Sequence, residues 1–159
     1  MGNRKIILAR IAGVGLAVMF AVFVCGCGGG GGGGDTPPTV SNQSVTPASL
    51  TPIGGVVTIR ATATDDVGVQ SVEAVVTGYD PTTQATKSTT VALTKGTGNT
   101  WSAQHTVAAI VSVPPGVADA NGETTYTVAI TATDTSGNKS TAVNASFKIT
   151  GLPPSNPNP

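Results

Sequence analysis

A two-residue alternation of apolar and polar side chains recurs through residues 57–149, and it narrows the possible folds more than any other feature. Successive side chains of an extended strand point to opposite faces, so this alternation is typical of strands with one buried face. Thr, Val and Ala dominate the region, and no window places apolar residues at helical spacing. The sequence predicts strands in seven segments: residues 39–45, 57–63, 71–76, 86–93, 100–107, 125–132 and 143–149.

Short strands of this kind, separated by Gly, Asp, Asn or Pro, are what two antiparallel sheets packed face to face require. We therefore expect an all-β fold, an antiparallel β-sandwich of about seven strands that occupies residues 39–150. No cysteine lies in this region, so apolar burial must stabilise the fold without a disulfide. The expected core residues are Ile59, Trp101, Tyr126, Val128, Ile130 and Phe147.

The amino-terminal region has a different composition. Arg4, Lys5 and Arg10 precede an uncharged apolar run of fourteen residues, 11–24. This length matches the apolar part of a secretory signal and falls short of the roughly 20 residues that a membrane-spanning helix needs. An uncleaved signal anchor over residues 6–24 is the alternative, although it must carry Arg10 inside its apolar stretch, where a charge is costly.

The residues at the end of the apolar run, Val24-Cys25-Gly26-Cys27, resemble the lipobox of bacterial lipoproteins. The resemblance implies that residues 1–26 are a signal peptide and that Cys27 carries the lipid as the first residue of the mature chain. Acylation at Cys25 would instead place bulky side chains where the family has small ones. A lipid-anchored protein of the bacterial envelope is therefore expected.

A tether rich in Gly and Pro is expected at residues 27–38. Its seven consecutive glycines, 28–34, should behave as a random coil with an r.m.s. span of roughly 15 Å. Gly28 after the lipidated cysteine resembles the form that is sorted to the outer membrane in hosts with two membranes. At the other end, residues 151–159 are rich in Pro and Asn and are predicted to form a disordered tail.

The charge distribution argues against nucleic acid as a partner. Three of the eight cations precede the predicted cleavage point and all eight acids follow it, which leaves a net charge of about −3 on the mature chain. Phosphate binding needs clustered Lys and Arg, which this chain lacks. Membrane contact is therefore expected through the lipid alone.

Two segments, residues 65–72 and 126–138, resemble the B-to-C and F-to-G stretches of bacterial immunoglobulin-like domains, and similar stretches occur in fibronectin type III modules. The likeness covers most of residues 37–149 and implies an Ig-like sandwich, a fold that hardly specifies a function. Tyr126, two residues before Val128, resembles the corner tyrosine of that fold, whose hydroxyl bonds to the backbone.

The Ig-like topology would bring these two loops to one end, with Asp65, Asp66, Asp134 and Asn138 close together. Calcium, which takes six to eight oxygen ligands, is the metal that such a group would bind. A simpler role is also open, because both loops have the pattern Asp-x-x-Gly of a turn that is capped by its first carboxylate.

Catalysis is not expected. His105 is the only histidine, and no Ser-His-Asp, HExxH or Cys-His pattern accompanies it. Sugar binding would require exposed aromatic faces, and only Tyr79 is expected to be free. We therefore expect no cofactor other than the lipid, and a non-enzymatic module for binding, adhesion or scaffolding with a protein or glycan partner. A calcium- or carbohydrate-binding accessory module is the alternative, and a hydrolase ranks third.

Overall fold

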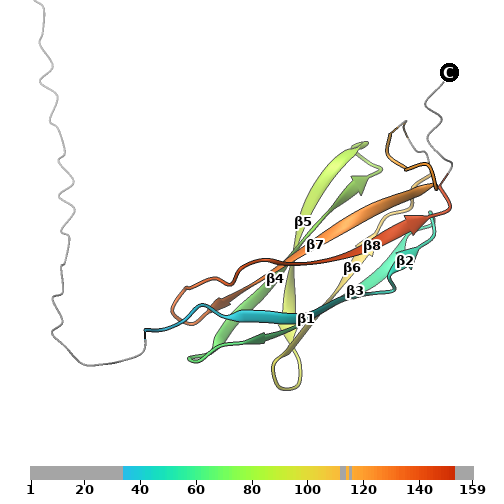
Figure 1. Cartoon of the computed structure of the whole chain (residues 1–159). Coiled ribbons are helices and arrows are strands. Elements are labelled where there is room, and N and C mark those ends of the chain that lie inside the picture. The colour runs from blue at the N-terminus through green and yellow to red at the C-terminus, as the bar shows by residue number, and fades with distance from the viewer. Residues whose placement is uncertain (1–33, 112–113, 115, 153–159) are drawn as a thin grey trace, which may run out of the picture. The chain divides into compact units, whose positions relative to one another are not determined.

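The computed structural model of the chain describes residues 34–111, 114 and 116–152. These residues form eight β-strands and no helix, so the predicted all-β fold is confirmed (Figure 1). The strands are β1 (Thr39–Thr46), β2 (Ser49–Leu50), β3 (Gly55–Thr64), β4 (Val69–Asp80), β5 (Ala85–Lys95), β6 (Thr100–Val107), β7 (Glu123–Asp134) and β8 (Val143–Thr150).

Every predicted segment lies within one of these strands, and β2 is the additional one. With only two residues, β2 is too short for a polarity pattern to indicate it. None of the described residues belongs to a helix with the length and hydropathy that a bilayer crossing requires. The predicted signal peptide, Cys27 and residues 153–159 lie outside the described residues.

The strands form one curled sheet in the order β1-β3-β6-β5-β4-β7-β8-β2. All neighbours are antiparallel except β2 and β8, which are parallel. β1 returns against β8, where the side-chain amide of Gln43 donates to the carbonyl oxygen of Asn144 at 3.4 Å, so the sheet nearly closes into a barrel. One sheet forms where two were expected, because β5 pairs mainly with β4 and then joins β6 through Thr94 and Lys95.

The core lies inside this curled sheet and consists of the inward stripes of the strands. Tyr126 and Phe147 occupy paired positions on β7 and β8, and their rings stack with centroids 4.9 Å apart. Burial of such apolar surface contributes about 25 cal/mol per Å² to folding. All six residues that the sequence placed in the core are buried in the structure: Ile59, Trp101, Tyr126, Val128, Ile130 and Phe147.

The two ends of the curled sheet are formed by different loops. At the entry end, the loops 65–68 and 135–138 lie beside residues 34–37, where the chain enters the fold, and Asn138 donates to Asp35. At the far end, the turn 51–54 lies against residues 108–111, joined by a hydrogen bond from Ile110 N to Pro52 O of 2.7 Å. The chain therefore enters the domain beside the loops that were predicted to bind calcium.

Candidate functional site

The two loops that carry the four predicted calcium ligands meet at the entry end. The β3–β4 and β7–β8 loops touch there, and the backbone N–H of Thr135 donates to the carbonyl oxygen of Gly68 at 3.1 Å. Asp65 Oδ2 accepts from the backbone N–H groups of Val67 and Gly68 at 3.0 and 2.7 Å, the contacts that a turn-capping carboxylate makes. Turn formation thus accounts for one of the two oxygens of Asp65.

Asp134 is fully buried and its hydrogen bonds are internal to the turn. Its Oδ1 accepts from the backbone N–H groups of Ser136 and Asn138, and its Oδ2 accepts from the side-chain amide of Asn138, each at 2.8 Å. Burial by itself would raise the pKa of Asp134, but these hydrogen bonds outweigh it and hold the pKa below its usual value. Asp134 and Asn138 therefore stabilise the loop, which is the simpler role that the turn pattern predicted.

A different acidic group forms at the same end. One carboxylate oxygen from each of Asp35, Asp65 and Asp66 lies within 4.8 Å of the other two. Thr36 Oγ1 donates to Asp66 Oδ1 at 3.1 Å, whereas Asp65 Oδ1 is buried without a hydrogen-bond partner. No local pattern predicted Asp35, because it precedes the first strand and its approach to the loop depends on how the chain enters the fold.

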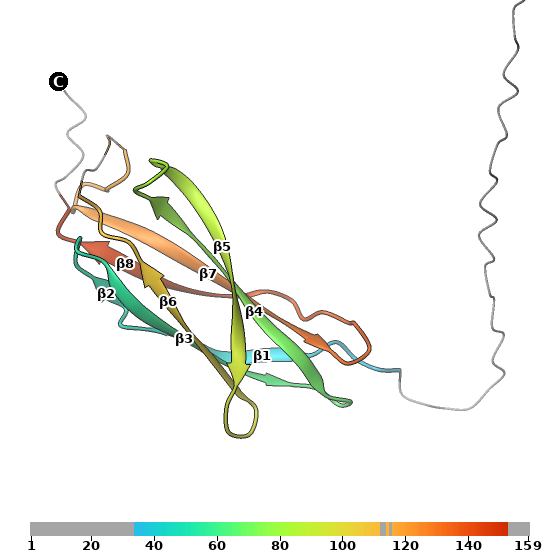
Figure 2. The same ribbon diagram turned by 180° about the vertical axis from the view of Figure 1, so that it is seen from behind.

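A second site lies where β5 and β6 separate. These strands pair only at Thr94 with Ser102 and at Lys95 with Trp101. Residues 85–91 of β5 pair with β4 alone, and residues 103–107 of β6 pair with β3 alone, so two strand edges face each other without a ladder between them. Figure 2 shows the two strands diverging from their common hairpin. We call this opening the seam.

A cavity of about 190 Å³ lies at the seam. Its walls come from β4, β5, β6 and β7, and alternation places the inward-facing side chains of those strands around it. The lining residues that matter most are Val76, Lys87, Thr89, His105, Val107 and Tyr126. The cavity therefore gives solvent access to core residues at the seam.

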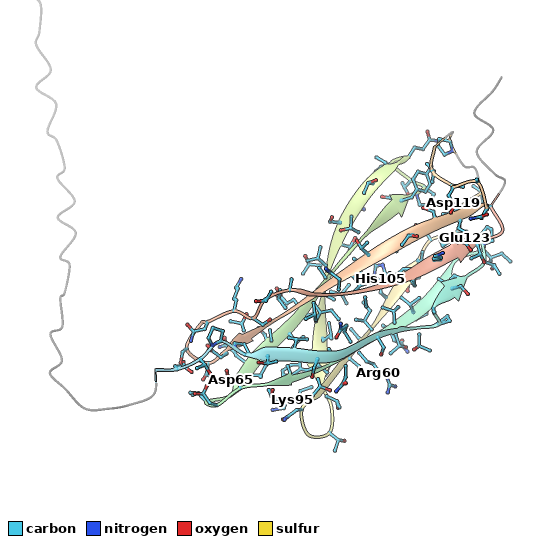
Figure 3. All side chains as sticks on the ribbon, in the orientation of Figure 1. Arg60, Asp65, Lys95, His105, Asp119 and Glu123 are labelled. Atoms are coloured by element: carbon cyan, nitrogen blue, oxygen red, sulfur yellow. The ribbon has the colours of Figure 1, made fainter. Side chains whose placement is uncertain are left out.

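Three kinds of polar group lie around the cavity: a lysine–aspartate ion pair, an imidazole and a tyrosine hydroxyl. Lys87 Nζ pairs with Asp80 Oδ2 at 3.2 Å, and the lysine side chain stays 59% exposed. His105, labelled in Figure 3, comes from β6, and burial lowers its pKa, so its imidazole is neutral near pH 7. The Tyr126 hydroxyl donates to the carbonyl oxygen of Tyr79, and burial raises the pKa of Tyr126 to about 12. The cavity thus carries an ion pair and a neutral imidazole.

Tyr126 differs from the corner tyrosine that it resembles. Its hydroxyl does bond to a backbone carbonyl, but that carbonyl belongs to Tyr79 on β4 and not to a residue shortly before it in the chain. Tyr79 was expected to be free, and this is wrong, because it is only 7% exposed. Gly116 and Val117 line the same hollow as Tyr79. No exposed aromatic face is present in the part of the chain that the structure describes.

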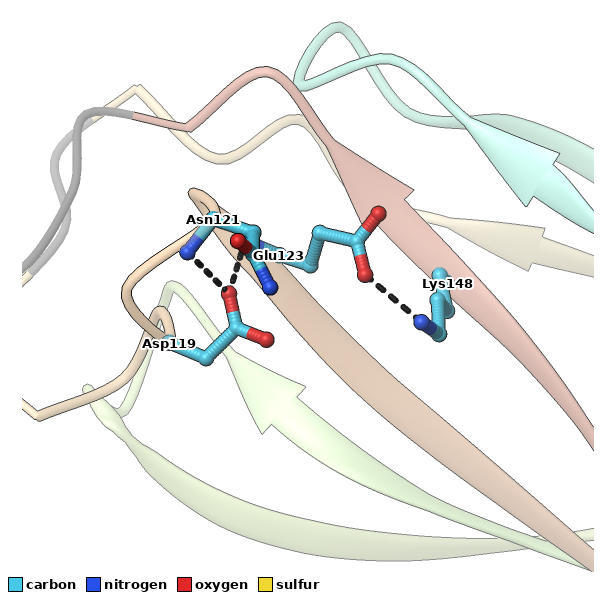
Figure 4. A network of polar contacts seen from close by, with 4 residues as sticks. All are labelled: Asp119, Asn121, Glu123 and Lys148. Carbon is cyan, nitrogen blue, oxygen red and sulfur yellow. Dashed lines mark hydrogen bonds and ion pairs between the residues drawn. The ribbon is translucent and has the colours of Figure 1, made fainter.

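A polar network at the far end has a structural role (Figure 4). Asp119 Oδ1 accepts from the backbone N–H groups of Asn121 and Glu123, both at 2.9 Å, and Glu123 Oε2 accepts from Lys148 Nζ at 2.6 Å. The hydrogen bond from Glu123 N is the main reason that the pKa of Asp119 is lowered, and the bond to Glu123 likewise raises the pKa of Lys148. The network fixes the start of β7 against β8.

No hydrogen bond joins His105 to a hydroxyl or a carboxylate among the described residues. Cys27, the predicted lipidation site, lies outside them. Neither a protein-family model, nor a curated protein, nor a solved structure matches this chain.

Proposed function

We propose that this chain is a cell-envelope lipoprotein whose single Ig-like β-sandwich serves as a non-enzymatic binding, adhesion or scaffolding module. A lipid on Cys27 would anchor it to the bacterial membrane after removal of residues 1–26, and residues 27–38 would tether the domain. In a host with two membranes the outer one is its expected location. The module would bind an extended segment of a protein by strand addition at the seam.

Strand pairing supports the Ig-like interpretation. β1, β3 and β6 are hydrogen-bonded neighbours on one side of the core, and β4, β7 and β8 are neighbours on the other. The parallel pair of β2 and β8 is formed because the first part of the chain leaves β1 and crosses to the other side. Two groups of strands that pack across a common core, although joined here within one curled sheet, are what a sandwich-like arrangement requires.

Unpaired main chain at the seam is the observation that carries the binding proposal. Residues 85–90 of β5 are all exposed, and their edge toward β6 has no strand partner. Such an edge offers N–H and C=O groups to an incoming strand, and proteins usually cover or distort edges that have no use. Within that stretch of β5, Lys87 is the single charged side chain that protects the edge against unwanted strand pairing.

The binding test uses the lipidated full chain as bait in envelope extract, with variants of two adjacent residues, Ser88 and Thr89. Successive backbone N–H groups of a strand point to opposite edges. Of the two residues, one therefore donates its N–H to β4 and the other points its N–H toward the seam. Proline has no N–H, so it breaks a hydrogen bond to β4 at one position and removes a free donor at the seam at the other. We expect Ser88→Pro or Thr89→Pro to keep the melting temperature and lose the captured protein. Matched Ser88→Ala and Thr89→Ala variants should still capture it.

Two results would contradict strand addition. One is a wild-type chain that captures no protein. The other is a stable proline variant that captures the same protein as the wild type. The anchor is tested separately by mass spectrometry of the mature protein, in which a diacylated or triacylated Cys27 is expected and Cys27→Ser should retain the uncleaved signal.

Calcium binding at the entry end is the second candidate function. The buried Oδ1 of Asp65, which has no hydrogen-bond partner, favours it, together with the nearby carboxylates of Asp35 and Asp66. Titration calorimetry with millimolar calcium should then give heat that Asp65→Asn abolishes, and the matched far-end variant Asp119→Asn should leave that heat unchanged. Absence of heat from the wild-type chain would remove this candidate.

A further inference from the structure

We infer that the cavity at the seam is a socket for one or two side chains of the added strand, and that this strand is an acidic, extended segment of another polypeptide. The inference rests on the proposed strand addition and names the chemistry of its partner. A strand that pairs with β5 would direct every second side chain inward, toward the space between β5 and β6. The cavity of about 190 Å³ occupies that space.

The size of the cavity favours side chains over a whole small molecule. Sites for drug-sized ligands usually measure roughly 300 to 1,000 Å³. The seam cavity is smaller, at about 190 Å³, and it opens between two unpaired edges. An aliphatic side chain on an added strand reaches such a space while its backbone pairs with β5.

The walls determine which side chains fit. Val76, Val107 and the buried Tyr126 provide apolar surface in the cavity, and Thr89 and His105 provide polar atoms. Because burial lowers the pKa of His105, the imidazole adds no charge at neutral pH. Inward positions of the partner strand should therefore carry Val, Ile, Leu or Thr.

The charges of the two facing strands favour an acidic partner. β5 carries Lys87 and Lys95 and no carboxylate, and β6 carries no Asp, Glu, Lys or Arg. The mature chain as a whole has a net charge of about −3, so β5 is a basic strand in an acidic domain. Lys87 pairs with Asp80 but stays 59% exposed, which leaves its ammonium accessible to a second carboxylate.

A second copy of this chain is a poorer occupant. If residues 85–91 pair with themselves in antiparallel register over their full length, Lys87 lies opposite Thr89 of the other copy and diagonal to the other Lys87. Like charges at such cross-strand positions are unfavourable, and no carboxylate on β5 compensates them. A segment with Asp or Glu avoids this repulsion.

The test uses two eight-residue peptide display libraries with the full chain as target. Both contain Val, Ile, Leu, Thr and Ser, and one adds Asp and Glu whereas the other adds Lys and Arg. We expect binders from the acidic library alone. Thr89→Trp should weaken their binding at least tenfold, because the indole fills the cavity from an exposed position. The matched control, Thr90→Trp, faces the opposite side of β5 and should bind as the wild type does.

The role of charge is tested with Lys87→Gln, which should also lower the affinity for the acidic binders at least tenfold. The control is Lys139→Gln at the entry end, which should leave that affinity unchanged. The inference is overturned by binders from the basic library in equal number, by full affinity in Thr89→Trp, or by a lack of binders from both. If envelope protein capture still depends on the seam in any of those cases, strand addition stands and only the partner chemistry is wrong.

Discussion

The ring of Tyr126 lies directly against the backbone of Gly78. A methyl group placed on Gly78 would overlap three carbon atoms of that ring. The ring cannot swing aside, because it stacks on Phe147 and its hydroxyl donates to the carbonyl oxygen of Tyr79. The single glycine in β4 therefore admits the aromatic pair to the core at the edge of the seam.

We expect Gly78→Ala to lower the free energy of unfolding by about 1 to 3 kcal/mol, since an added methyl in a packed site forces side chains and backbone to shift. Urea denaturation measures the change. Gly34→Ala is the matched control, because nothing lies within 4 Å of a methyl group added there. Equal stability of Gly78→Ala and the wild type would show that the ring is free to move.

Trp101 is the largest side chain on β6 and is 6% exposed. Its removal in Trp101→Ala should cost about 3 to 5 kcal/mol, from lost apolar burial and the cavity that remains. Trp101→Phe should cost less, because the indole Nε1 has no hydrogen-bond partner to lose. Thermal and urea denaturation measure the stability change of each variant. Val111→Ala is the control, and its stability change should be near zero because Val111 is 92% exposed. An unchanged melting temperature for Trp101→Ala would contradict a core role.

The strands and their inward faces could be predicted because the pattern that indicates them is local. Side chains such as Ile59 and Val128 alternate with Thr, and the same alternation fixes which of them is buried. The turn aspartates were predictable for the same reason, since Asp65 and Asp134 bond to N–H groups only two to four residues away.

The seam was not predictable from local patterns. β5 has a regular strand sequence, and whether its edge meets β6 depends on how the two halves of the sheet curl. The burial of Tyr79 likewise depends on distant residues, because Val117 reaches the hollow beside it from another part of the chain. Asp35 joins Asp65 for the same reason, through contacts that the sequence pattern does not encode.

His105 should make stability depend on pH as the pH falls below about 7. Burial lowers its pKa in the folded state, whereas the unfolded chain has the ordinary value near 6.5. As pH falls through 6.5, the unfolded state binds the proton first, so the free energy of unfolding decreases until the folded-state pKa is passed. His105 is the only histidine, so His105→Gln should remove this dependence. If the free energy of unfolding changes with pH equally in the wild type and in His105→Gln, this prediction is contradicted.

Asp134 should govern stability at lower pH. Its folded-state pKa is held below the unfolded value, because the hydrogen bonds from Asn138 and Ser136 outweigh burial. Its contribution is therefore complete above about pH 4 and is lost as pH falls through the folded-state pKa. Asp134→Asn should be less stable than the wild type at pH 7 and should lose less stability between pH 4 and pH 2. Urea midpoints across this range that fall equally in both proteins would show that the carboxylate is not the group responsible.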